Sequence, residues 1–222
     1  MKRGMIIGGG VLQEEFVLSF LQKRLTEEKR EDTCLIAADK GLLFLERNGI
    51  KPDAIVGDFD SADVSLLDRY KKDPRVTVRR LNPEKDWTDT EVAAQLALDE
   101  GCEVLEILGG TGGRIDHLLG NLQLLSLISR LGGDGYLLDE KNRIYVREQN
   151  FTVRRQEQWG KYFSLFAWGG DVTGLTLTGF KYQVEDFTLG TVGTRGVSNE
   201  MTAQEASVSF KSGRLLVVES GD

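Results

Sequence analysis

The sequence predicts an α/β domain over residues 1–140, followed by an all-β domain over residues 141–222. In the first part, short apolar runs alternate with segments whose apolar residues recur three and four positions apart. That alternation predicts a mostly parallel sheet with helices on both faces. In the second part the helical spacing disappears, and short segments alternate polar and apolar residues between Gly, Asn and Asp turns. This pattern predicts an antiparallel, sandwich-like domain.

The first domain contains predicted strands that are mostly short runs of Ile, Leu, Val and Ala. They cover residues 5–7, 35–38, 54–56, 76–78, 104–108 and 136–138. Amphipathic helices are predicted between them, around residues 12–21, 42–45, 66–70, 89–97 and 116–131. Thr88 and Glu91 have the spacing of a capping box, which predicts that the fourth helix begins just after Thr88. Gly49 and Gly101 are the predicted stops of the second and fourth helices.

The second domain contains shorter predicted strands with turn residues between them. They cover residues 143–146, 151–155, 162–168, 175–178, 206–210 and 215–218. A chain of 222 residues is long enough to bury a core in two domains of this size.

Composition limits the possible functions. A formal net charge of −7 argues against general binding to nucleic acid or to an anionic membrane, which needs a basic field. Because no apolar run approaches the length of a membrane span and the N-terminus lacks a signal-peptide core, we expect a cytoplasmic protein. Cys34 and Cys102 are expected to be reduced core residues. The only histidine, His117, excludes a multi-histidine metal site.

Polar clusters follow the predicted parallel strands at their carboxyl ends. Ligands of open parallel sheets bind beyond these ends, so the clusters are expected to share one rim. The clusters are DKG at residues 39–41, GDFDS at 57–61, KDWTD at 85–89 and GGTGGRIDH at 109–117.

The side chains of these loops suit a magnesium–nucleotide site. Asp58 and Asp60 lie two residues apart on one loop, and carboxylate oxygens are ligands that suit Mg²⁺. The glycines of residues 109–113 let the backbone approach a phosphate closely. Cations that would neutralise phosphate charge lie on the same loops, namely Lys40, Lys85 and Arg114. The sequence contains no G-x-x-x-x-G-K-[ST] motif, so the predicted site is not a P-loop.

Each acidic residue also has a structural explanation. The pair within residues 57–61 fits a solvated turn, and Asp39 fits a turn at the end of a strand. Asp89 in a first helical turn complements the helix dipole, and Asp116 and His117 could cap the helix that follows them. Taken one at a time these explanations are reasonable, but together they require four coincidences at one rim.

In these loops and in most of the chain, the sequence resembles the thiamin pyrophosphokinase (thiamine diphosphokinase) family in its bacterial form. The resemblance runs through nearly the whole chain, and its motifs occur in the family's order. They are ADKG at residues 38–41, GDFDS at 57–61, KDWTD at 85–89, GGRIDH at 112–117 with Asn121, and GVSNE at 196–200. Lys40 stands where the family often has glycine, and Met201 stands where phenylalanine often follows the last motif.

The resemblance implies an α/β nucleotide domain followed by a β domain, in a homodimer. It places thiamine at the subunit interface, between an α/β domain and residues of a β domain. It also implies a reaction, the transfer of diphosphate from Mg-ATP to the hydroxyl of thiamine, giving thiamine diphosphate and AMP. By the same likeness, Ser198 and Asn199 are expected in the thiamine site. From the residues alone they would be a plain turn.

The residue assignments that follow from this resemblance are these. Asp58, Asp60 and Asp89 are expected to hold Mg²⁺ and to serve catalysis, with Asp116 orienting the nucleophile or binding substrate. The expected nucleotide or phosphate contacts are Asp39, Lys40, Gly41, Ser61, Lys85, Thr88, Gly110 and Arg114. Two other functions could use the same acidic rim, a Mg-dependent nucleotide phosphohydrolase and a non-catalytic nucleotide-binding protein.

Overall fold

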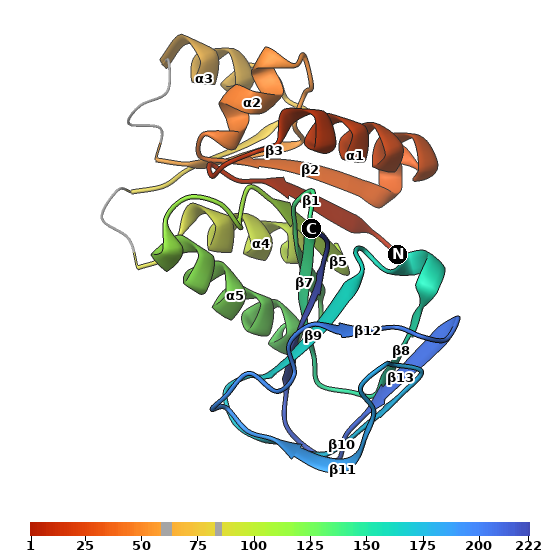
Figure 1. Ribbon diagram of the computed structural model, residues 1–222. Coiled ribbons are helices and arrows are strands. Elements are labelled where there is room, and N and C mark those ends of the chain that lie inside the picture. Colours follow the sequence, from red (N-terminus) through yellow and green to blue (C-terminus); the bar gives the residue numbers. More distant parts are fainter. Residues whose placement is uncertain (59–63, 83–85) are drawn as a thin grey trace. The chain divides into compact units, whose positions relative to one another are not determined.

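The computed structural model describes residues 1–58, 64–82 and 86–222. The chain divides into two compact units, Met1–Glu140 and Lys141–Asp222 (Figure 1). The α-helices of the described residues all belong to the first unit, and the second unit is built from strands and one short 3₁₀ turn.

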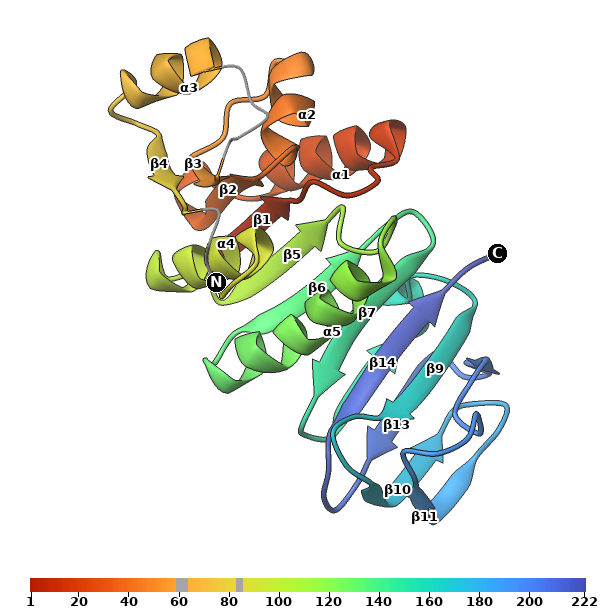
Figure 2. The ribbon, with the colours of Figure 1, turned by 90° about the vertical axis from the view of Figure 1, so that its left-hand side faces the viewer.

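The first unit is built on a parallel sheet with the strand order β6-β5-β1-β2-β3-β4. Its strands are β1 (Arg3–Ile7), β2 (Thr33–Ala38), β3 (Ala54–Gly57), β4 (Thr77–Arg80), β5 (Val104–Leu108) and β6 (Asp134–Leu138). The chain extends the sheet on one side of β1, then returns and adds β5 and β6 on the other side (Figure 2). In sheets of this kind ligands bind where the direction reverses, which here is beyond the carboxyl ends of β1 and β5.

Helices cover both faces of this sheet. They are α1 (Glu14–Glu27), α2 (Gly41–Arg47), α3 (Val64–Lys71), α4 (Asp89–Asp99) and α5 (Ile115–Arg130). The first two lie on one face, and α4 and α5 lie on the other (Figure 1). Between these layers every residue of β2, β3 and β5 is buried, as continuous apolar runs predict for a sheet covered on both sides.

The predicted helix ends are confirmed. Thr88 is the N-cap of α4, and its side-chain oxygen accepts the Glu91 backbone N–H at 3.1 Å. Gly49 and Gly101 follow α2 and α4 with φ of +66° and +81°, a conformation that glycine adopts without strain. The fourth strand was predicted at residues 76–78, whereas β4 covers Thr77–Arg80. Val76, which is buried, lies just before the strand begins. As the edge strand of the sheet, β4 has no fully buried residue.

The second unit contains two antiparallel groups of strands, with the orders β12-β9-β14-β7 and β11-β10-β13-β8. Its strands are β7 (Asn142–Arg147), β8 (Phe151–Arg154), β9 (Tyr162–Ala167), β10 (Val172–Thr178), β11 (Val184–Leu189), β12 (Asn199–Glu200), β13 (Glu205–Ser209) and β14 (Leu215–Ser220). This architecture confirms the predicted fold class.

Aromatic rings contribute to the interior of the second unit. Phe163 on β9 and Phe180 are each 1% exposed, and their ring centroids lie 5.0 Å apart. The sequence did not predict β11 and β12. β11 is an edge strand with only Leu189 fully buried, and β12 has two residues, so neither carries a recognisable apolar pattern.

In the part of the chain that the structure describes, we find no helix with the length and hydropathy of a membrane span.

Candidate active site

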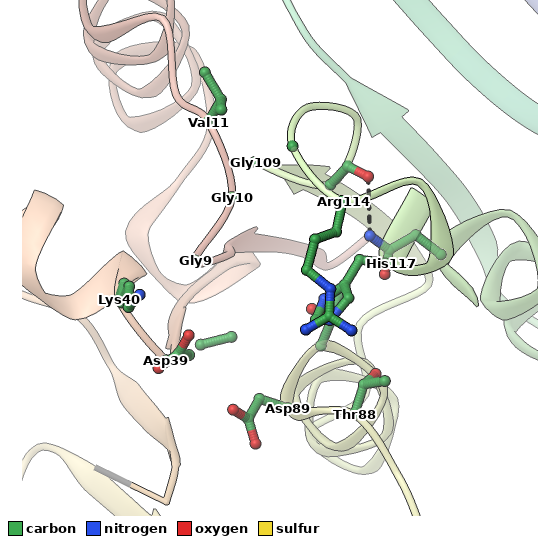
Figure 3. Close-up of a pocket in the computed structure, with 15 residues that line it drawn as sticks. Gly9, Gly10, Val11, Asp39, Lys40, Thr88, Asp89, Gly109, Arg114 and His117 are labelled. Carbon is green, nitrogen blue, oxygen red and sulfur yellow. Dashed lines mark hydrogen bonds between the residues drawn. The ribbon is translucent and has the colours of Figure 1, made fainter. Parts of the chain in front are cut away.

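A cavity of about 550 Å³ opens at the carboxyl ends of the parallel strands (Figure 3). Four segments of the first unit line it: the loop after β1, the loop after β2, the start of α4 and the loop after β5 with the first turns of α5. The lining residues are Gly9, Gly10, Val11, Ala38, Asp39, Lys40, Thr88, Asp89, Thr90, Gly109, Gly110, Gly113, Arg114, His117 and Asn121.

Two glycine loops meet in this cavity. The Gly8 N–H donates to the Leu108 carbonyl at 2.8 Å, which joins the end of β1 to the end of β5. A Cβ on Gly10 would lie 2.2 Å from the carbonyl oxygen of Gly109, and Gly109 itself has φ of +76°. The two backbones therefore approach more closely than any residue with a side chain would allow. Such a surface presents backbone groups directly to a bound phosphate.

Asp39 leaves β2 in an unusual backbone conformation. Its φ is +52°, a region that residues other than glycine rarely adopt, and its N–H donates to the Val56 carbonyl at 2.9 Å. Burial raises the pKa of the Asp39 carboxyl, and the negative charges of Asp89 and Asp58 raise it further. Strain of this kind, together with a desolvated acid, is typical of a functional site.

Asp58 and Asp89 bring further negative charge to the same edge of the sheet. Asp58 directly follows β3, and Asp89 is the first residue of α4, where it points into the cavity (Figure 3). Together with Asp39 they are oxygen donors whose charges act on one another, the donor chemistry that Mg²⁺ requires. Among the residues that the structure describes, no three acidic, histidine or cysteine side chains form a closed metal site. Mg²⁺ typically takes one or two carboxylates and completes its shell with water and phosphate, so these residues fit it.

Arg114 extends toward the start of α4, where Thr88 and Asp89 lie (Figure 3). Its guanidinium donates to both carboxylate oxygens of Asp116, at 3.1 and 2.5 Å. These bonds lower the pKa of Asp116 and raise that of Arg114. Asp116 lies outside the cavity lining, and its contact with the cavity runs through Arg114.

The residues predicted for this site fall into three groups: those that line the cavity, those that the structure describes outside its lining, and those outside the described residues. Six of them line the cavity: Asp39, Lys40, Thr88, Asp89, Gly110 and Arg114. Asp58 and Asp116 belong to the second group, as does Gly41. Gly41 packs α2 against β1, where a Cβ would lie 1.9 Å from the Ile7 carbonyl oxygen. Asp60, Ser61 and Lys85 lie outside the described residues.

Sequence reasoning missed several residues of this cavity. The glycine run after β1 lacks any nucleotide fingerprint, so it was given no role, yet Gly9 and Gly10 line the cavity. Asn121 belongs to a resembling motif but had no assigned function. Its side-chain amide is buried and donates to the Gly110 carbonyl at 2.9 Å, which ties the glycine loop to α5.

A second cavity, of about 420 Å³, lies within the second unit. Its lining is mostly apolar and aromatic, with Lys181 and Arg195 as the cations: Phe163, Leu165, Leu175, Leu177, Lys181, Tyr182, Gln183, Val184, Phe187, Leu189, Arg195, Gly196, Val197 and Asn199. The Arg195 guanidinium lies over the Phe187 ring at 4.5 Å. Of the two predicted thiamine residues, Asn199 lines this cavity, and Ser198 lies beside it on the surface. Sequence reasoning missed Phe187, since β11 itself was not predicted, and it missed Tyr182, which lies just before that strand.

Comparisons with known proteins identify the family. A family model described as "Thiamin pyrophosphokinase, catalytic domain" matches residues 25–132, and one described as "Thiamin pyrophosphokinase, vitamin B1 binding domain" matches residues 148–215. The thiamine pyrophosphokinase of Bacillus subtilis (strain 168) is 34% identical over 198 residues, which cover 89% of this chain and 92% of that protein. The chain belongs to the thiamin pyrophosphokinase family.

Solved structures of thiamin pyrophosphokinases have the same fold. The Bacillus subtilis enzyme superposes with a TM-score of 0.85 at 31% identity, over 100% of both chains. The enzyme from Geobacillus thermodenitrificans gives 0.81 at 30% identity, over 99% of this chain and 98% of that one. The cavity of the first unit falls mainly within the span matched by the catalytic model, and the cavity of the second unit falls within the span matched by the B1-binding model.

Proposed function

We propose that this chain is a thiamine diphosphokinase, which transfers diphosphate from Mg-ATP to the hydroxyl of thiamine and releases AMP. One observation carries the proposal: within a chain of this family, glycine backbone, half-buried acids and a long cation converge on one cavity at the carboxyl ends of the parallel strands. Positioning and charge stabilisation are the main requirements of phosphoryl-type transfer, and this cavity supplies groups for both.

The nucleotide is assigned to the cavity of the first unit. The glycine loops after β1 and β5 would receive the phosphates, with Asn121 fixing the second loop. Arg114 and Lys40 would neutralise phosphate charge, and Asp116 would hold the Arg114 guanidinium in place. Asp39, Gly41, Ser61, Lys85, Thr88 and Gly110 complete the proposed nucleotide half.

Mg²⁺ is assigned to Asp58, Asp60 and Asp89. Support comes from the charges of Asp58 and Asp89, which raise the pKa of the Asp39 carboxyl at this edge and which a divalent cation would offset. When bound, Mg²⁺ would supply charge neutralisation at the β- and γ-phosphate oxygens.

The proposed reaction forms one bond and breaks one. The thiamine hydroxyl oxygen bonds to the β-phosphorus of ATP, and the bond from that phosphorus to the oxygen bridging the α-phosphate breaks. AMP leaves with the bridging oxygen, and the hydroxyl releases one proton. Groups directed at the β-phosphate therefore act on the step itself, and the remaining contacts hold ATP in position.

The second unit is assigned to thiamine, through Ser198 and Asn199 at its cavity. We also propose that the enzyme is a homodimer that works in the cytoplasm. Cys34 and Cys102 are free and buried, which supports a reducing compartment. Light scattering of the purified chain would test the dimer.

The deciding experiment measures products from ATP with and without thiamine. With Mg²⁺ present, we expect AMP and thiamine diphosphate in equal amounts, and no AMP when thiamine is omitted. Removing Mg²⁺ with EDTA should abolish turnover, and adding it back should restore it. Release of phosphate or ADP without thiamine would instead indicate a phosphohydrolase. ATP binding without any turnover would indicate a nucleotide sensor.

A further inference from the structure

Ser198 and Asn199 are adjacent in the sequence, but their side chains have different surroundings. Ser198 is exposed, and its hydroxyl has no hydrogen-bond partner among the residues that the structure describes. Asn199 is only 8% exposed. A ligand therefore has direct access to the serine hydroxyl, whereas the asparagine amide is already enclosed by protein.

Backbone groups occupy most of the Asn199 amide. Its Oδ1 accepts the Tyr182 N–H and the Glu200 N–H, both at 2.9 Å. Its Nδ2 donates to the Tyr182 carbonyl at 2.7 Å. An asparagine side chain has two acceptor positions and two donor hydrogens, so three of the four are used inside the protein. The amide pairs with Tyr182 as a neighbouring strand would.

This pairing fixes the segment around Tyr182 against β12. The Lys181 N–H donates to the Glu200 carbonyl at 2.8 Å, and Phe180 forms an isolated antiparallel bridge with Met201. The Tyr182 ring itself is 61% exposed and lines the cavity of the second unit. The buried amide thus determines where an exposed aromatic side chain of the cavity lies.

Ser198 is held by a second buried side chain. Its φ is +59°, in the left-handed region that is strained for residues other than glycine. Its N–H donates to the Ser164 Oγ at 2.9 Å, and Ser164, on β9, is only 6% exposed. Next to it, the Leu165 N–H donates to the Gly196 carbonyl at 2.9 Å. These contacts keep the strained serine in one conformation.

We propose that Asn199 and Ser164 are positioning residues of the thiamine half, and that of the Ser198–Asn199 pair only Ser198 contacts the ligand. The two buried side chains hold Tyr182 and Ser198 in place before thiamine arrives. The proposal rests on the proposed function for the identity of the ligand, but its structural part concerns the thiamine-free protein.

The structural part is tested by amide hydrogen exchange without thiamine. In the wild-type protein, the Tyr182 backbone N–H and the Asn199 side-chain amide should already be protected. Asn199→Ala should increase exchange at Tyr182 about tenfold or more. The matched control is Asn150→Ala, in the same unit. Asn150 Oδ1 accepts the Phe210 N–H at 2.9 Å but does not line the cavity, so Tyr182 should be unaffected.

The functional part is tested by kinetics on the same variants. Asn199→Ala and Ser164→Ala should each raise the KM for thiamine about tenfold, while the KM for ATP stays at its wild-type value. Ser198→Ala should also raise the thiamine KM, but with wild-type exchange at Tyr182. Asn150→Ala should change neither KM.

Opposite outcomes would overturn the proposal. If the Asn199 amide exchanges freely in the thiamine-free wild type and becomes protected only when thiamine is added, Asn199 is a ligand contact. The same conclusion follows if Asn199→Ala raises the thiamine KM without changing exchange at Tyr182. The wild-type measurement decides the matter even if the variant does not fold. If the wild type forms no thiamine-dependent AMP, the proposed function fails. The exchange results still test whether the Asn199 amide holds the Tyr182 backbone.

Discussion

The two cavities of this protein are built by different means. In the first unit, the side chains that line the cavity lie on loops after parallel strands or at helix starts. Local backbone features fix them: glycines, the Thr88 helix cap and the positive φ of Asp39. In the second unit, side chains tie together segments distant in sequence, as Asn199 does with Tyr182 and Ser164 does with Ser198. A parallel sheet brings its loops to one edge whatever their sequence. A site built on antiparallel strands instead needs specific side-chain hydrogen bonds between distant segments.

The largest expected effect tests the chemistry of the first cavity. Asp58→Asn removes a carboxylate from the edge that we assign to Mg²⁺, and kcat should fall about a hundredfold or more. The KM for thiamine should stay near its wild-type value, because Ser198 and Asn199 lie in the other unit. Steady-state kinetics at saturating Mg²⁺ measures both constants.

A matched control for Asp58→Asn is available at the C-terminal end of α4. Asp99 lies in its last turn and accepts a hydrogen bond from Gln95 at 2.9 Å, a bond that asparagine can also accept. Asp99→Asn should therefore keep wild-type kinetics. Near-normal turnover of Asp58→Asn would contradict the metal assignment, and a shared loss in both variants would point to a general charge effect.

The contrast between the cavities explains which parts the sequence could predict. Continuous apolar strands and the Thr88 cap have purely local causes, and both were predicted correctly. The expectation that polar loops share one edge needed only the rule for parallel sheets. Asp39, Asp89 and Arg114 accordingly line one cavity, as that rule predicts.

What the sequence could not predict depends on pairings between distant residues. No pattern near Asn199 indicates that its amide pairs with a backbone 17 positions earlier. β11 is an edge strand of mostly exposed and half-buried residues, so its contribution of Phe187 to the second cavity could not be predicted. Gly10 was missed for a related reason, because its need for glycine comes from the Gly109 carbonyl on the loop after β5.

An intermediate effect tests how closely the first cavity depends on its backbone. Gly10→Ala would place a Cβ 2.2 Å from the Gly109 carbonyl oxygen, so the two glycine loops must separate. We expect a loss of stability of about 1–3 kcal/mol. We also expect the KM for ATP to rise about tenfold, which corresponds to about 1.4 kcal/mol of lost binding. Thermal unfolding and ATP titration measure these changes.

Gly120→Ala is the control for that substitution. Gly120 lies within α5, and a Cβ there would meet no atom within 4 Å. Alanine should stabilise the helix by about 0.5–1 kcal/mol and leave the KM for ATP unchanged. If Gly10→Ala binds ATP as well as Gly120→Ala does, the close approach of the loops is unimportant for the nucleotide.

The smallest expected effect tests whether a side-chain hydrogen bond between distant segments affects substrate binding in the first unit, as we propose for Asn199 in the second. Tyr70 on α3 donates to Glu46 Oε2 on α2 at 2.7 Å, and Arg69 also pairs with that carboxylate. The Tyr70 bond is the main cause that lowers the pKa of Glu46, so it stabilises the fold while Glu46 is ionised.

Tyr70→Phe should lower the free energy of unfolding by about 1 kcal/mol at pH 7. That difference should shrink as the pH falls through the lowered pKa of the Glu46 carboxyl in the folded protein, because the carboxyl then gains a proton in the folded state as well. The KM values for ATP and thiamine should stay the same, because this hydrogen bond joins two helices and neither of its residues lines a cavity. Chemical denaturation across pH checks the stability, and a raised KM would show that the first cavity also depends on distant ties.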